Sequence, residues 1–289
     1  MFDPNRQRLA LERAARIALP GDDFLVARAT QEMVERLGAV QRQFNHALAL
    51  FGRTPALADA LNNAENVGKV IRVERTAHHS IADHIADHDD LGLPEAEADL
   101  AIAPLTLHWS EDLPGQLVQI RRALKPDGLF LAMLPGPDTL KELRECLLQA
   151  ESDIRGGAGQ RVDPFTDIRD AGSLLQRAGF ALPVLDREEV VVRYTSPLAL
   201  ITDLRRFGAT NQLKTAKDNP PLSKAIVARM IELYLERFSD PDGRIRATFS
   251  FISLSGWVPH ESQQKPSKPG SAKSRLADAL AVPEEKLPR

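Results

Sequence analysis

Short apolar strands alternate with amphipathic helices along most of the chain, and this alternation most limits the folds that the chain can adopt. Residues 47–51 read as a buried strand, residues 56–61 as a helix, and residues 68–74 as a second strand that ends on an acid. Further buried strands are predicted at 98–105 and 129–135. Strands that alternate with helices are typical of a parallel sheet with helices on both faces. The sequence therefore predicts an α/β protein with a doubly wound, Rossmann-like sheet.

The segments on either side of these strands predict N-terminal helices, a helical cap and a tail. Apolar residues at helical spacing place two helices within residues 1–40. Further helices, at about 137–180 and 196–240, are expected to cap the carboxyl edge of the sheet within a domain that spans 41–259. The stretch "RGGAGQ", within the first of these ranges, is expected to be flexible. Residues 260–289 are rich in proline, serine, lysine and glycine, so we expect a loosely ordered tail.

The composition argues against nucleic-acid and membrane partners. The net charge is −3 and the pI is near 6.2, so no broad basic field is available for nucleic acid. The longest apolar runs, such as residues 129–134, are far shorter than the ~20 residues that a membrane-spanning helix needs. Cys146 is the only cysteine, so no internal disulfide can form. We therefore predict a cytoplasmic protein without a membrane span.

Three segments carry a resemblance to a known family: "LTLHWSEDLPGQLVQIRRALKPDGLFLAMLPGPDTLKELR", "DPFTDIRDAGSLLQRAGF" and "GRIRATFSFISLSGWVPHESQ". With the order of helices and strands, they resemble the class I S-adenosylmethionine-dependent methyltransferases. More narrowly, the chain is similar to the malonyl-thioester methyltransferase of biotin synthesis and to the methyltransferase-fold assembly factors of respiratory complex I, a family associated with arginine hydroxylation. The resemblance implies S-adenosylmethionine as cofactor and a protein substrate, with a subunit of a respiratory complex as one candidate.

The loop after the first strand departs from the family's pattern. The motif D-x-G-x-G-x-G falls on Ala49, Phe51, Arg53 and Pro55, and the loop's glycine, Gly52, lies between the keyed positions. Glycines at these positions let the backbone approach a ligand and adopt positive φ. Two hypotheses stay open: a cofactor-dependent enzyme that methylates or hydroxylates a protein, or a pseudoenzyme that serves as a binding or assembly module.

The resemblance also implies cofactor contacts at four positions: Gly52, Glu74, Asp87 and Leu105. Glu74 ends the second strand, where this fold places a carboxylate that accepts hydrogen bonds from ribose hydroxyls. Asp87, or Asp89, falls near the place where the family contacts the adenine amine. The alternative for Glu74 is an exposed acid at a strand end.

Side chains that follow the fourth and fifth strands are candidates for the reaction rim. His108 is a candidate base, and Trp109 is suited to stacking on a ring or to packing under the next helix. Asp138 and Thr139 reach the same rim, where Asp138 suits a guanidinium or serves as a helix N-cap. Arg144 suits a substrate carboxylate, or pairs with neighbours on its helix.

Two further sets of residues are weaker candidates. Tyr194 lies in the cap segment and suits closure over a substrate. His84 and His88 share a face if "IADHIADH" is helical, which suits metal ligation. A solvent-exposed face of histidines and acids accounts for the same sequence pattern, so no metal site is predicted.

Overall fold

The computed structural model describes residues 1–19, 21–75, 82–86, 90–217 and 219–264. The chain divides into two compact units, Met1–Pro259 and His260–Arg289, and the first of these carries all of the helices and strands described below. The N-terminal helices therefore belong to the same compact unit as the sheet. The finer division into 1–40, 41–259 and 260–289 stays a prediction.

Among the described residues, seven strands form one sheet in the order β3-β2-β1-β4-β5-β7-β6. The first five pair in parallel, whereas β7 runs antiparallel to both of its neighbours. This order confirms the predicted doubly wound α/β fold. The strands are β1 (Phe44–Leu50), β2 (Val67–Glu74), β3 (His84–Ile85), β4 (Ala98–Pro104), β5 (Leu124–Pro135), β6 (Ala181–Tyr194) and β7 (Ile245–Trp257).

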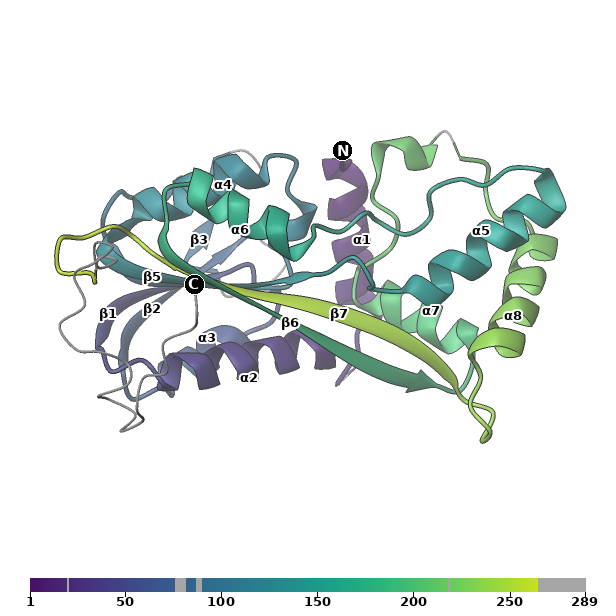
Figure 1. The fold of residues 1–289 in the computed structure, drawn as a ribbon, viewed down its shortest axis with the longest axis horizontal. Helices are drawn as coiled ribbons and strands as arrows, with labels where there is room; N and C mark the ends of the chain where they lie inside the picture. Colours follow the sequence, from purple (N-terminus) through teal and green to yellow (C-terminus); the bar gives the residue numbers. More distant parts are fainter. Residues whose placement is uncertain (20, 76–81, 87–89, 218, 265–289) are drawn as a thin grey trace, which may run out of the picture. The chain divides into compact units, whose positions relative to one another are not determined.

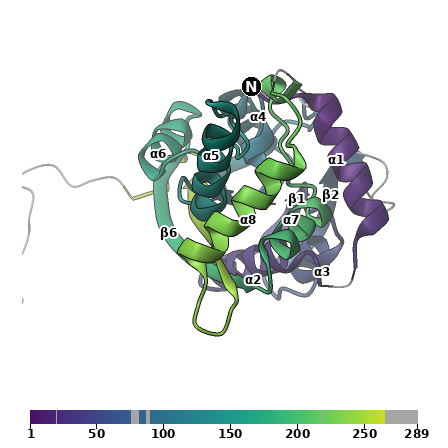
Figure 2. The ribbon, with the colours of Figure 1, turned by 90° about the vertical axis from the view of Figure 1, so that its right-hand side faces the viewer.

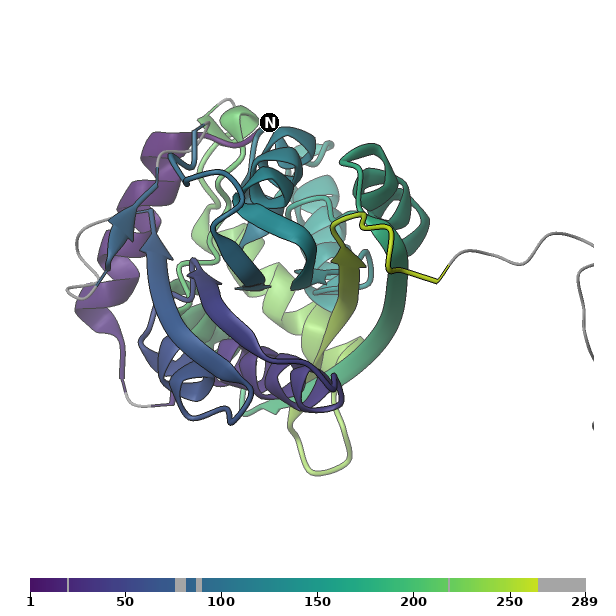
Figure 3. The ribbon, with the colours of Figure 1, turned by 90° about the vertical axis from the view of Figure 1, so that its left-hand side faces the viewer.

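Helices cover both faces of the sheet (Figures 1 and 3). The helices α2 (Phe24–Gly38) and α3 (Ala56–Asn62) lie on one face, and α4 (Leu113–Ala123) and α6 (Ile168–Arg177) lie on the other. Strands β4 and β5 are buried along most of their length because both faces are covered, which explains their continuous apolar sequences. Two separate apolar clusters result, one on each side of the sheet.

Of the remaining helices, α5, α7 and α8 lie beside the far halves of β6 and β7 (Figure 1). The bounds of the remaining helices are α1 (Pro4–Ile17), α5 (Lys141–Arg155), α7 (Pro197–Arg206) and α8 (Lys224–Phe238), and short 3-10 helices occur at η1 (Leu107–Trp109) and η2 (Lys214–Lys217). Helices α5 and α8 pack side by side, and α1 packs against α7 (Figure 2). Cys146 of α5 is completely buried in this packing, and burial raises the pKa of its thiol to about 12.

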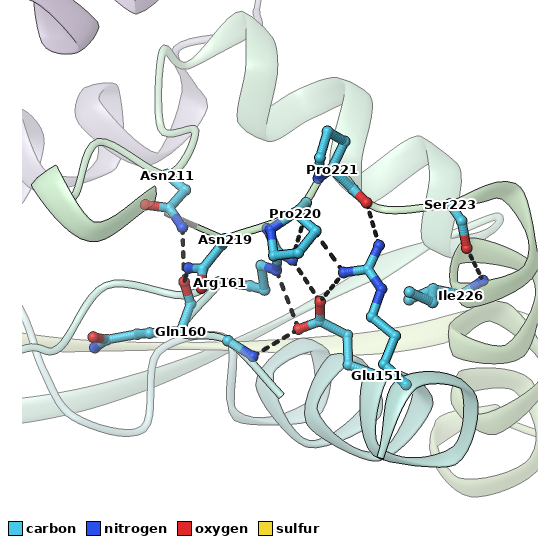
Figure 4. A network of polar contacts seen from close by, with 11 residues as sticks. Glu151, Gln160, Arg161, Asn211, Asn219, Pro220, Pro221, Ser223 and Ile226 are labelled. Atoms are coloured by element: carbon cyan, nitrogen blue, oxygen red, sulfur yellow. Dashed lines mark hydrogen bonds and ion pairs between the residues drawn. The ribbon is translucent and has the colours of Figure 1, made fainter. Parts of the chain in front are cut away.

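The loop after α5, which contains "RGGAGQ", is held near its end by a buried carboxylate, and its expected flexibility stays a prediction. Glu151 is 1% exposed and accepts hydrogen bonds from the Gly159 N–H at 3.0 Å and from Arg161 Nε at 3.1 Å. Arg155 Nη1 donates to the same carboxylate at 3.1 Å, and Arg161 Nη2 donates to the Pro220 carbonyl at 2.7 Å (Figure 4). These contacts, the Glu151 network, tie α5 to the segment that leads into α8.

Candidate functional site

The loop after β1 keeps the backbone of a glycine loop without the glycines. Phe51 and Arg53 have φ of +55° and +62°, the left-handed region that glycine favours. They occupy two of the positions where the family motif has glycine. The Phe51 N–H donates to the Val73 carbonyl at 2.7 Å, so the loop stays joined to β2. Both residues therefore have the backbone conformation that glycine favours, although neither is a glycine.

The side chains of this loop fill the space that glycines would leave open. Phe51 is buried and packs in one of the apolar clusters, with the Arg75 guanidinium carbon 4.2 Å from its ring centroid. Arg53 reaches the end of α7, where a Cβ on Gly208 would lie 3.3 Å from Arg53 Nη2. Burial lowers the pKa of Arg53 to about 10, against the opposing effects of Glu74 and Asp23.

Glu74 is buried and bound within the chain. It is 1% exposed, so the alternative of an exposed acid at a strand end is wrong. Arg72 Nε donates to Glu74 Oε1 at 2.9 Å, and the Arg53 N–H donates to Oε2 at 3.3 Å. Burial raises the pKa of Glu74, and the bond from Arg72 opposes that shift. Its predicted ribose contact stays a prediction, with both carboxylate oxygens already engaged.

The space beside Glu74 does not fit S-adenosylmethionine. The cavity there measures about 20 Å³, which is room for about one water molecule. Its lining combines the loop and strand ends with α1: Gln7, Leu11, Phe51, Arg53, Glu74, Arg75, Thr106 and Trp109. The residues present therefore leave no room for a ribose and adenine at the place where this fold usually holds them. Asp87, Asp89 and His88 lie outside the described residues.

A larger cavity, the edge cavity, lies at the carboxyl ends of β4 and β5 and has a volume of about 130 Å³. Four of the predicted site residues line it: Leu105, His108, Trp109 and Thr139. Most of the other lining residues are apolar, among them Leu25 of α2, Leu204 of α7 and Phe249 of β7, whereas Arg53, Arg161, Asp163 and Asn211 are polar. The fold thus brings the four predicted residues to one place, and their chemical roles stay predictions.

His108 is neutral in the edge cavity. Burial, followed by the nearby charge of Arg53, lowers the pKa of His108 to about 3. Its ring centroid lies 4.4 Å from that of Trp109 and 6.0 Å from that of Phe165. No described residue hydrogen-bonds to its Nδ1. An imidazole with this pKa is a weak base. The low pKa and the two ring contacts therefore favour a packing role for His108.

Asp163 is an acid of the edge cavity that sequence reasoning missed. Burial raises the pKa of its carboxyl to about 6, and a bond from the Trp109 side chain opposes that shift. Its Oδ1 is buried and has no hydrogen-bond partner in the described part of the chain. Asp163 follows Arg161 by two residues, so the Glu151 network fixes its position. The available signal was an acid that opens one of the resemblance segments.

The other rim candidates are engaged elsewhere. Asp138 pairs with Arg187 and does not cap α5; the N-cap residue is Leu140, which makes no side-chain cap bond, so that expectation was wrong. Arg144 donates to the Pro137 and Thr139 carbonyls at 3.2 and 3.3 Å.

Thr139 and Tyr194 are held inside the fold. Thr139 Oγ1 donates to the Ser250 carbonyl at 2.9 Å, which attaches the segment before α5 to β7. Tyr194 is buried and belongs to the apolar cluster beneath the cap, not to the residues that line the edge cavity.

His84 and the helices bear on the metal and membrane predictions. His84 lies in β3, not in a helix, and its Nε2 is 2.7 Å from the Leu91 carbonyl oxygen. Within the described ranges no three histidine, cysteine, aspartate or glutamate side chains gather as metal ligands would. None of the described helices combines the length and the apolar character that crossing a bilayer requires.

The sheet order, the acid that ends β2 and the loop after β1 define a protein of the methyltransferase fold. In agreement, a family described as a methyltransferase domain matches residues 40–132. The chain is 34% identical to "Arginine-hydroxylase NDUFAF5, mitochondrial" of Rattus norvegicus, over 96% of this chain and 83% of the rat protein. The chain therefore belongs to the NDUFAF5 family, which confirms the resemblance inferred from the sequence.

Two other comparisons agree with this assignment. A malonyl-[acyl-carrier protein] O-methyltransferase of Gallionella capsiferriformans is 33% identical over 60% of this chain and 57% of that protein. The crystal structure of the YcgJ protein from Bacillus subtilis superposes with a TM-score of 0.53 at 14% identity, over 81% of this chain and 99% of that chain. The second comparison supports the fold alone.

The predicted cytoplasmic location is contradicted by these relatives. The NDUFAF5 proteins of rat, zebrafish (Danio rerio) and human are all named as mitochondrial. The names point to a mitochondrial location instead. The cytoplasmic prediction was wrong because it rested on a single cysteine and on the lack of a long apolar run, and neither separates one reducing compartment from another.

Proposed function

We propose that the chain binds an arginine-bearing segment of a protein partner in the edge cavity, and that it serves the assembly of a respiratory complex in this way. The observation that carries the proposal is Asp163, a carboxylate whose Oδ1 has no partner among the described residues of a mostly apolar cavity. The name of the rat and human relatives, arginine-hydroxylase, supports an arginine side chain as the group that is bound.

The surroundings of Asp163 suit a guanidinium. A carboxylate accepts bidentate hydrogen bonds from this group, and aromatic faces such as those of Trp109 and Phe165 attract a planar cation. His108 is neutral and so does not repel it. Arg161, the nearest basic residue along the chain, is held by Glu151. Arg53 and Arg161 both line the cavity, and their charges oppose the proposal.

The proposal is tested with two small probes, N-acetyl-arginine-methylamide and its neutral citrulline counterpart, by isothermal titration calorimetry. We expect saturable heat with the arginine probe only, and a loss of about tenfold or more in affinity for Asp163→Asn, as for a charged hydrogen bond. The matched control is the exposed Glu145 of α5, changed as Glu145→Gln, which removes an acid of the surface and should leave the affinity unchanged. Equal binding of the two probes would refute the proposal.

The pH dependence gives a second readout. Because the pKa of Asp163 is about 6, affinity for the arginine probe should fall roughly tenfold between pH 7.5 and pH 5, and Asp163→Asn should remove this dependence. The variant should fold. A raised carboxyl pKa means that the stabilising contribution is complete below 3.8 and is lost as pH rises through about 6, so a neutral amide does not weaken the fold at neutral pH.

We also propose that S-adenosylmethionine is not held in the usual way, since Glu74 is bound to Arg72 and the space beside it is about 20 Å³. Titration of millimolar S-adenosylmethionine should give no saturable heat and no thermal shift with the wild-type chain, while a malonyl-[acyl-carrier protein] O-methyltransferase run in parallel provides the positive control. Stoichiometric binding that Glu74→Gln weakens would contradict this and restore the predicted ribose contact.

A further inference from the structure

The edge cavity is closed around the acid that the proposed function needs. Oδ1 of Asp163 has almost no surface that water can reach, and the cavity measures about 130 Å³. Sites that take small molecules usually measure roughly 300 to 1,000 Å³. An arginine side chain that comes from a partner therefore reaches this oxygen only if part of the cavity wall moves.

One exposed hydrogen bond joins two segments that both line this cavity. Asn211 lines it, and the Nδ2 of Asn211 donates to the Gln160 carbonyl at 2.9 Å (Figure 4). Gln160 directly precedes Arg161, which also lines the cavity. We call the bond between Asn211 and Gln160 the latch. Asn219 Nδ2 donates to the same carbonyl at 3.3 Å and so reinforces it.

The Gln160 side of the latch is fixed. Glu151 accepts hydrogen bonds from Gly159 and Arg161, the two neighbours of Gln160, and Glu151 is only 1% exposed. Breaking the contacts of a buried carboxylate is costly. Any movement that opens the cavity here therefore falls on the side of Asn211.

The Asn211 side is a short strap, residues 209–211. Ala209 and Asn211 line the cavity. Gln212 is completely buried, and its Nε2 donates to the Gly208 carbonyl at 2.7 Å, which joins the two ends of the strap. An exposed hydrogen bond contributes little net stability, because water replaces it when it breaks. A segment held in this way opens locally at low cost.

We propose that the latch gates the edge cavity: Asn211 and the Gln160 carbonyl hold the strap closed, and their separation admits the arginine side chain of the partner. The role of the latch rests on the proposed function, because Asp163 is the group that opening exposes. A ligand that binds only the open state has its affinity reduced by the open fraction. The latch therefore regulates both the affinity and the rate of entry.

Trp109 reports on opening without any ligand. It lines the cavity and is 6% exposed, whereas Trp257, the chain's other tryptophan, is not among the lining residues. In a Trp257→Phe background, acrylamide quenching of the Trp109 fluorescence measures opening. We expect Asn211→Ala to raise the quenching constant about two- to tenfold, as for one lost hydrogen bond. Asn62→Ala, at an exposed asparagine of α3, is the matched control and should leave it unchanged.

A cross-link tests the latch in the opposite direction. Gln160→Cys/Asn211→Cys places one thiol on each side, and dibromobimane joins two nearby thiols. The buried Cys146 should not react. We expect the cross-linked chain to show less Trp109 quenching than the wild type and to bind the arginine probe at least about tenfold more slowly. Gln160→Cys alone keeps the carbonyl and, treated in the same way, should behave as the wild type does.

The latch and the arginine-binding site fail separately in these measurements. If Trp109 quenching responds to both changes but no variant binds the arginine probe, the latch stands as the gate of the cavity and the arginine-binding proposal fails. If the cross-linked chain binds the arginine probe as fast as the wild type does, the latch is overturned and arginine binding stands. Trp109 quenching that neither Asn211→Ala nor the cross-link alters would also overturn the latch.

Discussion

Replacing Arg72 with methionine is expected to destabilise the protein by about 3 to 5 kcal/mol, because the change leaves Glu74 as a buried carboxylate without its cation. Both side chains are almost fully buried, so water cannot take the place of the lost partner. Urea denaturation followed by circular dichroism at pH 7.5 measures the change. A loss below about 1 kcal/mol would show that the pair is not desolvated as the structure has it.

The double variant Arg72→Met/Glu74→Met is the matched control. Replacing both members of a buried ion pair with apolar residues is often close to neutral, so most of the lost stability should return. The single variant should also recover at low pH. Burial already raises the pKa of Glu74, and a raised pKa means that the stability contribution is complete below the unfolded value and is lost as pH rises through the folded one.

Glu151→Ala is expected to cost about 3 kcal/mol, because it removes the acceptor of Arg161, Arg155 and the Gly159 N–H at one buried position. The exchange of the Gly159 amide hydrogen should accelerate, since the carboxylate that accepts its hydrogen bond is gone. Binding of the arginine probe should weaken as well, because Asp163 follows the anchored Arg161. Glu145→Gln on the exposed face of α5 should change none of these quantities.

The same carboxylate sets a pH dependence. Burial works to raise the pKa of Glu151, but the bonds from Arg161 and Gly159 outweigh it and hold the pKa below its ordinary value. A lowered folded pKa means that the stabilisation is present above about 4.5 and is lost as pH falls through the folded value. We therefore expect the wild type to lose folding stability as the pH falls. We expect Glu151→Ala to lose less, because it lacks this carboxylate.

Local patterns predicted the sheet well. The unit of β1, α3 and β2 follows from apolar runs and spacing, and the register of β1 against β2 only realises that pattern. The pair of Arg72 and Glu74 was also within reach, because residues two apart in a strand share a face. The sequence prediction considered Glu74 without Arg72 and therefore treated its carboxylate as unpaired.

The parts of the site that could not be predicted depend on distant residues. Hydrogen bonds join Glu151, Arg161 and the Pro220 carbonyl across loops. The length of a loop does not predict which residues it brings into contact. The positive φ of Phe51 and Arg53 depends on a loop that is hydrogen-bonded to β2. The residue types phenylalanine and arginine do not predict it. Asp163 became a candidate only once the fold placed it in one cavity with Trp109 and Phe165.

The burial of Cys146 has a practical consequence for measuring the cap. The thiol of the chain's single cysteine is fully buried and has a pKa of about 12, so it forms almost no thiolate at neutral pH. We therefore expect that it does not react with maleimide dyes in the folded protein. The native sequence therefore already behaves as a background for site-specific labelling. One introduced thiol, such as Leu235→Cys on the exposed side of α8, would carry a fluorophore that reports on the cap while each probe is added.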